Sequence, residues 1–174
     1  MSTELFENID TTHKVPPIIL IDASGSVRGN FTTEISIFDK MMNIVEQINS
    51  DKFRLIFWNS GTDNTNNFPN GVFKIPYVVD KKTISQPFKL TRDKISDYCL
   101  TYPHLAFNAI GENWINNSEP THIYFLTDGQ IGYVNCPIYK LNELKNELRH
   151  SIEKLFKNYN NIHLHIITIE SKNI

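Results

Sequence analysis

The stretch of sequence that decides the fold is Pro17-Ile18-Ile19-Leu20-Ile21-Asp22-Ala23-Ser24-Gly25-Ser26. A short, unbroken apolar run that ends in polar and small residues is typical of a buried strand that feeds a loop. In an open parallel sheet, ligands bind in the crevice outside the carboxyl ends of the strands. We therefore expect Asp22, Ser24 and Ser26 to lie at that edge, where their oxygen atoms suit a hard divalent cation. An ordinary turn capped by an aspartate is the alternative.

A second segment repeats this design. Residues 121–129 read Thr-His-Ile-Tyr-Phe-Leu-Thr-Asp-Gly, an apolar strand that ends at Thr127, Asp128 and Gly129. Between the two segments, Thr101 lies in a polar loop ahead of an apolar helical run. Two strands of one sheet that each deliver an aspartate at the same edge are hard to attribute to packing alone. The two segments together therefore predict a metal site.

These segments resemble the von Willebrand factor A (vWA) family, which includes the integrin inserted domains. That family carries a metal-ion-dependent adhesion site (MIDAS) with the pattern Asp-x-Ser-x-Ser, then a loop Thr, then an Asp in a Thr-Asp-Gly turn. Residues 22–26 match the first element, residues 127–129 match the third, and Thr101 is the best match for the second. Family members usually carry glycine before that threonine, where this chain has Cys99-Leu100. The resemblance extends from about residue 16 to residue 169.

The resemblance implies a metal site built from five residues: Asp22, Ser24, Ser26, Thr101 and Asp128. In such a site the hydroxyls ligate the cation directly, while the aspartates act largely through waters. Few direct negative charges leave the cation electrophilic, so the carboxylate of an Asp or Glu on a partner protein would complete its coordination. Mg²⁺ or Mn²⁺ suits six oxygen ligands better than zinc does, and Ca²⁺ would prefer more carboxylates. We therefore expect divalent-cation-dependent protein–protein binding.

The pattern along the chain predicts a doubly wound α/β fold: a mainly parallel, open, Rossmann-like sheet with helices on both faces and one antiparallel edge strand. Strands are expected at about 17–22, 52–58, 72–79, 122–126 and 163–169. Helices are expected at about 32–49, 93–99, 104–116 and 141–156, with Thr32 or Thr33 as a cap of the first and with residues 80–92 as a linker.

We divide the chain into a flexible arm at residues 1–14 and a vWA-like domain at residues 15–174. Family domains usually continue with a further helix and strand after the last strand found here. The sequence therefore suggests a domain shortened at its C-terminus or one piece of a longer product.

Composition limits the choice of partner and compartment. The chain has 17 basic and 19 acidic side chains and a net charge of −2, which argues against nucleic acid or anionic lipid as a ligand. Its apolar runs are far too short to span a membrane, and Met1 to Lys14 lacks the apolar stretch of a signal peptide. Cys99 and Cys136 are too few for a disulfide framework, so we expect free thiols and a cytoplasmic location.

Two other functional classes stay open. In the first, the domain is a structural or assembly scaffold with a vestigial metal site, and it forms part of a larger assembly. In the second, which ranks third, Asp22 serves a metal-dependent hydrolase. Ser24 lacks the flanking glycines of a nucleophile elbow, and no glycine-rich phosphate loop is present, so we expect no enzymatic activity. His163 and His165 point the same way on one strand, and we expect that face to pack against a helix or to meet solvent rather than to bind a metal.

Overall fold

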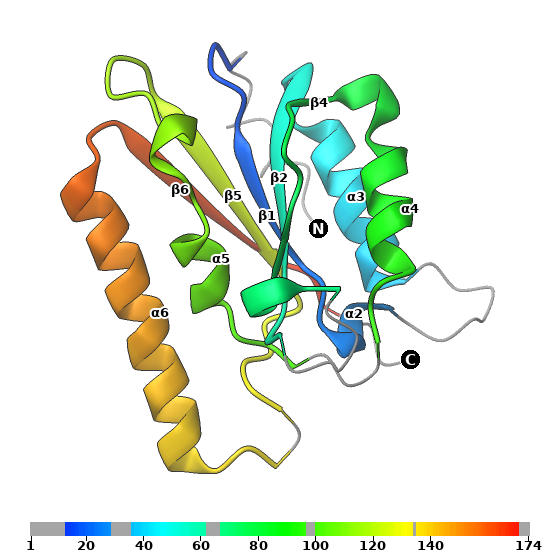
Figure 1. The fold of residues 1–174 in the computed structure, drawn as a ribbon, viewed down its shortest axis with the longest axis vertical. Coiled ribbons are helices and arrows are strands. Elements are labelled where there is room, and N and C mark those ends of the chain that lie inside the picture. The colour runs from blue at the N-terminus through cyan, green and yellow to red at the C-terminus, as the bar shows by residue number, and fades with distance from the viewer. Residues whose placement is uncertain (1–12, 29–35, 62–66, 97–99, 134, 171–174) are drawn as a thin grey trace.

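The computed structural model describes residues 13–28, 36–61, 67–96, 100–133 and 135–170. The apolar run of the first segment forms β1 (Ile18–Asp22), and all five of its residues are buried. This strand is buried on both faces because it lies inside the sheet, between β2 (Lys52–Trp58) and β5 (Thr121–Thr127) (Figure 1). Both pairings are parallel, so the three strands end at the same edge of the sheet.

The described residues form a six-stranded sheet in the order β3-β2-β1-β5-β6, with β4 also paired to β2. Strand β6 (Ile162–Thr168) is parallel to β5, whereas β3 (Val72–Lys74) and β4 (Val79–Asp80) are antiparallel to β2. The single edge strand predicted at 72–79 is thus divided in two, because Pro76 lies between the halves and has no N–H for the ladder. A mainly parallel sheet with an antiparallel edge confirms the predicted α/β fold class.

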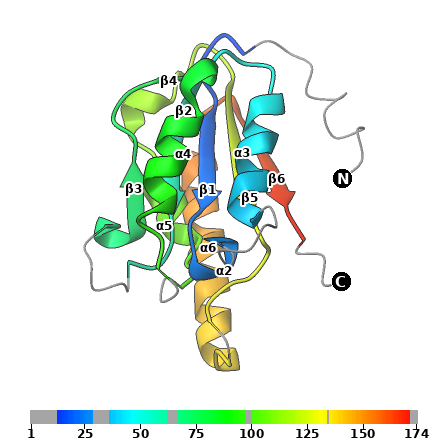
Figure 2. The ribbon, with the colours of Figure 1, turned by 90° about the vertical axis from the view of Figure 1, so that its right-hand side faces the viewer.

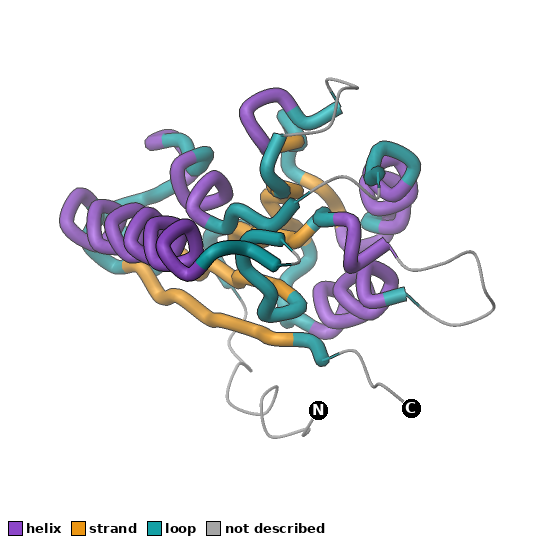
Figure 3. The backbone as a smooth tube through the Cα atoms, turned by 90° about the horizontal axis from the view of Figure 1, so that it is seen from below, coloured by secondary structure: helices purple, strands orange, loops and turns teal. Residues whose placement is uncertain are grey.

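Helices cover both faces of the sheet, as two perpendicular views show (Figure 2, Figure 3). They are α3 (Ile37–Gln47) and α4 (Ser85–Arg92) on one face, and α5 (His104–Asn108) and α6 (Ile138–Asn158) on the other. Successive residues of β1 serve the two cores in turn: Ile19 and Ile21 pack on the α3 side, and Ile18 and Leu20 on the α6 side. The remaining short elements are α2 (Gly25–Arg28) and the 3₁₀ turns η1 (Pro69–Gly71), η2 (Lys81–Thr83) and η3 (Glu112–Trp114).

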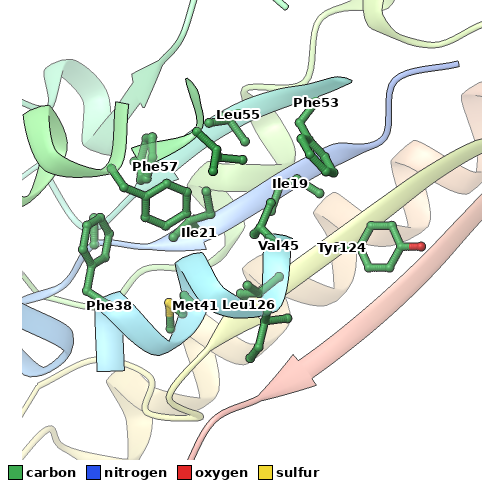
Figure 4. Close-up of a cluster of buried hydrophobic side chains, with 14 of the residues drawn as sticks. Ile19, Ile21, Phe38, Met41, Val45, Phe53, Leu55, Phe57, Tyr124 and Leu126 are labelled. Carbon is green, nitrogen blue, oxygen red and sulfur yellow. The ribbon is translucent and has the colours of Figure 1, made fainter. Parts of the chain in front are cut away.

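The core on the α3 side is rich in aromatic rings (Figure 4). Phe57 of β2 is fully buried, and its ring centroid lies 5.9 Å from that of Phe38 on α3 and 5.2 Å from that of Phe88 on α4. Rings at these separations attract one another beyond simple burial, and each buried Phe stabilises the fold by roughly 1.5–3 kcal/mol. These contacts fix the helices over β1 and β2, and so fix the loops at the carboxyl edge.

Helix α3 begins later than the sequence predicts. The pattern predicts a helix over 32–49 capped by Thr32 or Thr33, which lie outside the described residues. Ser36 caps the described helix, because its Oγ accepts a hydrogen bond of 3.1 Å from the backbone N–H of Asp39. A serine at this position satisfies one of the unpaired donors of the first turn.

The linker predicted at residues 80–92 is wrong, because this segment contains η2 and α4. Pro87, which suggested a break, is the third residue of α4, where a helix needs no N–H donor. Phe88 follows it and is buried in the core, so the helix is held by packing.

The helices predicted at 93–99 and 104–116 differ from the structure. The described part of the first segment, residues 93–96, is turn and coil. The second prediction is too long, because α5 ends at Asn108 and Gly111 adopts an extended backbone before η3. The long amphipathic helix and the last strand are confirmed as α6 and β6.

Residues 1–12 of the predicted arm lie outside the described residues. His13, the first described residue, contacts β5: its Nε2 lies 2.9 Å from the hydroxyl oxygen of Tyr124. Across the described part of the chain, no helix is long and apolar enough to cross a membrane.

Candidate metal centre

Strands β1 and β5 deliver two aspartates to one edge of the sheet. Ile21 of β1 is paired with Leu126 of β5, so the residues that follow each of them emerge side by side. Asp22 is the last residue of β1, and Asp128 comes directly after the end of β5. This is the lower edge of the sheet in Figure 1, where α2 follows β1. The aligned register therefore explains why two residues so distant in sequence meet.

The Asp22 carboxylate is fully buried and accepts two hydrogen bonds. Its Oδ1 accepts from the backbone N–H of Ser24 at 2.9 Å, and its Oδ2 accepts from the hydroxyl of Thr127 at 3.1 Å. The pKa of this carboxyl is raised to about 7, first because burial disfavours its charge and second because Asp128 carries a like charge nearby; the hydrogen bonds from Ser24 and Thr127 act in the opposite direction. The site thus holds negative charge that is only partly compensated.

Ser24 and Ser26 connect the two aspartates, because the backbone N–H of Ser24 bonds to Asp22 and the hydroxyls continue the chain of bonds to Asp128. Ser24 Oγ and Ser26 Oγ lie 3.2 Å apart, and Ser26 Oγ donates to Asp128 Oδ2 at 2.5 Å. The other Asp128 oxygen, Oδ1, accepts from the backbone N–H of Gln130 at 3.0 Å. The structure therefore brings four of the five predicted site residues into one hydrogen-bonded network.

Gly129 shapes the turn that carries Asp128. Its φ of +84° lies in the region that favours glycine, and an added Cβ would stand 3.1 Å from Thr168 Cγ2. Its backbone N–H donates to Thr127 Oγ1 at 3.1 Å, which orients the same hydroxyl that bonds to Asp22. The Thr-Asp-Gly sequence thus acts as one unit, in which the threonine supports one aspartate and presents the other.

Thr101 reaches this edge through its backbone. It is buried, and it forms a two-way bridge with Gly132: its N–H donates to the Gly132 carbonyl at 3.1 Å, and the Gly132 N–H donates back at 2.8 Å. Gly132 lies in the loop that follows Asp128, so the bridge ties the Thr101 loop to the network. Among the hydrogen bonds between described residues, the Thr101 hydroxyl makes none with the other four.

Two residues outside the five predicted ligands support this edge of the sheet. Thr127 bonds to Asp22, although the motif suggested it only as a neighbour of Asp128. Asn59 follows β2, is fully buried, and its amide nitrogen lies 3.5 Å from the carbonyl oxygen of Ala23. The signal for both was positional, because each stands at the carboxyl end of a strand beside β1.

The donor atoms at this edge suit a hard cation. Nowhere in the described ranges do three or more His, Cys, Asp and Glu side chains gather in a way that could hold a metal ion. A site here would therefore use two carboxylates together with hydroxyls, which is an all-oxygen set of low charge. The mutual repulsion of Asp22 and Asp128 is the kind of strain that a divalent cation relieves, so the residues present fit such an ion.

The chain has a relative of much greater length. No protein-family model matches this chain. "Uncharacterized protein L611" of Acanthamoeba polyphaga mimivirus is 44% identical over 173 residues, which is 95% of this chain but 18% of that protein. The chain therefore spans less than a fifth of the curated relative that it matches.

Solved structures align with this chain at low sequence identity. Proximal thread matrix protein 1 (PTMP1) from the mussel byssus aligns with a TM-score of 0.55 and 15% identity, over 92% of this chain and 39% of that one. An aerotolerance-related membrane protein from Bacteroides fragilis aligns with a TM-score of 0.48, and PTMP1 with a zinc-occupied MIDAS motif with 0.47. The first likeness and the strand order together support a vWA-like fold.

Proposed function

We propose that this chain is a divalent-cation-dependent protein-binding module. In this proposal a MIDAS-like site holds Mg²⁺ or Mn²⁺ and captures an Asp or Glu carboxylate of a partner protein. Its residues are Asp22, Ser24, Ser26, Thr101 and Asp128. The observation that carries the proposal is the hydrogen-bonded network of two carboxylates and two serine hydroxyls at the carboxyl edge of the sheet.

The proposed ligands fall into two groups according to their charge. The hydroxyls of Ser24, Ser26 and Thr101 are neutral oxygen donors, while Asp22 and Asp128 supply the negative field that attracts the cation. A bound cation would retain much of its charge and an exchangeable water at a free position. A partner carboxylate that replaces this water gains a charge-assisted bond in a partly desolvated crevice. Because the net charge of the chain is −2, the attraction is local to the ion.

A scaffold with a vestigial metal site is the second candidate. One observation favours it: Ser26 and Asp128 already satisfy each other at 2.5 Å, so the network closes on itself through protein groups alone. A raised pKa also allows Asp22 to stay neutral by binding a proton in place of a cation.

We further propose that the module is not an enzyme and that it works in the cytoplasm. Within the described ranges, no histidine or lysine makes a hydrogen bond with the network, so a hydrolase would lack a general base beside Asp22. Cys136 is a free thiol, which suits a reducing compartment.

Calorimetric titration of Mg²⁺ and Mn²⁺ separates the first two candidates. Binding to the folded state alone adds about 2.7 kcal/mol to the free energy of unfolding at a hundredfold excess over Kd. Asp128→Asn should abolish both the heat of binding and the added stability. Asp80→Asn, the same change on an exposed residue of β4, is the matched control. Absence of binding heat and of any melting-temperature shift at millimolar cation would establish the scaffold reading.

The partner-capture step has its own test. Water-proton relaxation on the Mn²⁺-loaded protein reports the exchangeable water on the ion. A short peptide with one Asp should displace that water and lower the relaxation enhancement, whereas the same peptide with Asn in its place should not. Equal effects of the two peptides would show that a carboxylate is not what the ion captures.

A further inference from the structure

A second group of titratable side chains lies at the opposite end of the sheet. Four imidazoles and one phenol form it: His13, His122, His163, His165 and Tyr124, called here the histidine cluster. Two of its members come from β5 and two from β6, where the register pairs His122 with His163 and Tyr124 with His165. Side chains at paired positions of neighbouring strands share one face, so these rings gather on the α3 side.

The rings are in direct contact. His122 Nδ1 lies 2.8 Å from His165 Nε2, and the ring of His122 stacks on that of His163 at 4.7 Å between centroids. The sequence prediction that the strand's histidines face a helix or solvent thus missed their contact with a third histidine. His13 joins from the segment before β1: its ring lies 4.4 Å from that of His122, and its Nε2 is 2.9 Å from the Tyr124 hydroxyl.

The bond between His122 and His165 requires that at least one of the two imidazoles be neutral. A hydrogen bond between two ring nitrogens needs one N–H donor and one lone pair, and it is lost when both rings carry two N–H groups. Burial lowers the pKa of His13, His122 and His165, and neighbouring imidazoles lower it further; the value for His122 is about 4. The groups that shift these pKa values are other histidines of the cluster, contributed by β5, β6 and the segment before β1, and no carboxylate is among them.

We propose that the histidine cluster is a proton-operated latch that holds residues 13–16 against β5 at neutral pH and releases them on acidification. Protons from water occupy the ring lone pairs, which removes the N–H···N bond between His122 and His165 and places like charges in stacked rings. His13 lies outside the strands, whereas the other four members belong to β5 and β6, so His13 leaves first. Release stops at Pro17, because its carbonyl accepts a hydrogen bond of 2.9 Å from the Arg54 N–H.

Nuclear magnetic resonance of the natural chain tests the latch. A nuclear Overhauser contact between the His13 and Tyr124 rings should be present at pH 7.5 and lost as the pH falls to about 4, where the lowered pKa of His122 lies. Backbone signals of β5 and β6 should persist across that range. Persistence of the ring contact below about pH 4, with the imidazoles protonated, would overturn the proposal, as would its absence at pH 7.5.

Two variants sharpen the result. His165→Gln removes one of the like charges that drive release, so the release midpoint should fall by about half a pH unit. Tyr124→Phe removes the hydroxyl that holds His13, so the contact of His13 with His122 should already be weakened at pH 7.5. His150→Gln, on α6 outside the cluster, is the matched control and should leave the midpoint unchanged. If His165→Gln leaves the release midpoint unchanged and Tyr124→Phe keeps the contact of His13 with His122, the cluster does not hold residues 13–16 in place.

Discussion

Ser26 and Asp128 lie 102 residues apart in sequence, yet the hydroxyl of the first donates to Oδ2 of the second at 2.5 Å. The bond joins the loop after β1 to the turn after β5, and it is exposed to solvent. It therefore contributes little to stability, on the order of 1 kcal/mol, but it sets the spacing of the oxygen atoms that a cation would meet.

Ser26→Ala should weaken Mg²⁺ binding about tenfold, because it removes one proposed ligand, an effect of about 1.4 kcal/mol. The free energy of unfolding in EDTA should change little. Calorimetry measures the first quantity and urea denaturation the second. The matched control is Ser118→Ala, which removes another exposed serine hydroxyl that donates to a side chain, Asn116 Oδ1 at 2.6 Å. Unchanged Mg²⁺ affinity in Ser26→Ala would remove this hydroxyl from the site.

Asp128→Asn should stabilise the metal-free protein while it destroys the response to cation. The new amide can still accept from Gln130 and can donate to Ser26, and the charge that repels the buried Asp22 is gone. The gain should be on the order of 1 kcal/mol, the value of about one pKa unit. Urea denaturation in EDTA and in Mg²⁺ measures both effects. Lower stability in EDTA combined with a retained Mg²⁺ response would contradict the predicted role of this carboxylate.

Phe57→Ala should lower the free energy of unfolding by about 3–5 kcal/mol, because a fully buried ring leaves a cavity among Phe38 and Phe88. Phe156→Ala makes the same change on α6, where the side chain is 46% exposed, and should cost about 1 kcal/mol or less. Urea denaturation compares the two variants. Equal losses would mean that the aromatic core is not the main source of stability.

The stabilising contribution of His122 should fall as pH drops from about 6.5, the ordinary histidine pKa, toward 4, while the raised pKa of Asp22 acts in the opposite direction over the same interval. The folded-state pKa of His122 is lowered to about 4, so the unfolded chain binds protons more readily than the folded chain in this interval. The stabilisation is complete above about pH 6.5 and is lost as the pH approaches 4. Urea denaturation at a series of pH values should show that His122→Gln gains stability relative to the natural chain as the pH falls from about 6.5 toward 4. His150→Gln should show no such gain.

Much of the fold and part of the site could be predicted from the sequence because the signals are local. The apolar runs before Asp22 and Asp128 fix two buried parallel strands, and parallel strands end together. The contacts that were missed depend on register between distant segments: the bridge from Thr101 to Gly132, and the contact of His13 with Tyr124, 111 residues away. No local pattern encodes such pairings, because tertiary packing decides them.

The predicted helix boundaries were wrong for a different reason. Pro87 suggested a break, but the first turn of a helix tolerates proline, and only burial of the adjacent Phe88 shows that a helix forms there. The pattern over 104–116 reflects apolar residues of α5 and η3 that pack in one core without one continuous helix.

The position of β1 has a consequence for how the chain folds as it is synthesised. One edge of β1 pairs with β2, whose residues follow within about forty positions of the chain. The other edge pairs with β5, where Ile18 is paired with Ile123, so this pairing cannot form until much more of the chain has been made. Closing so long a loop is slow, and until it closes, an apolar strand presents an open edge that invites pairing with another chain. A nascent chain that has not yet emerged past Thr127 therefore carries an exposed aggregation-prone edge, and chaperones would bind there.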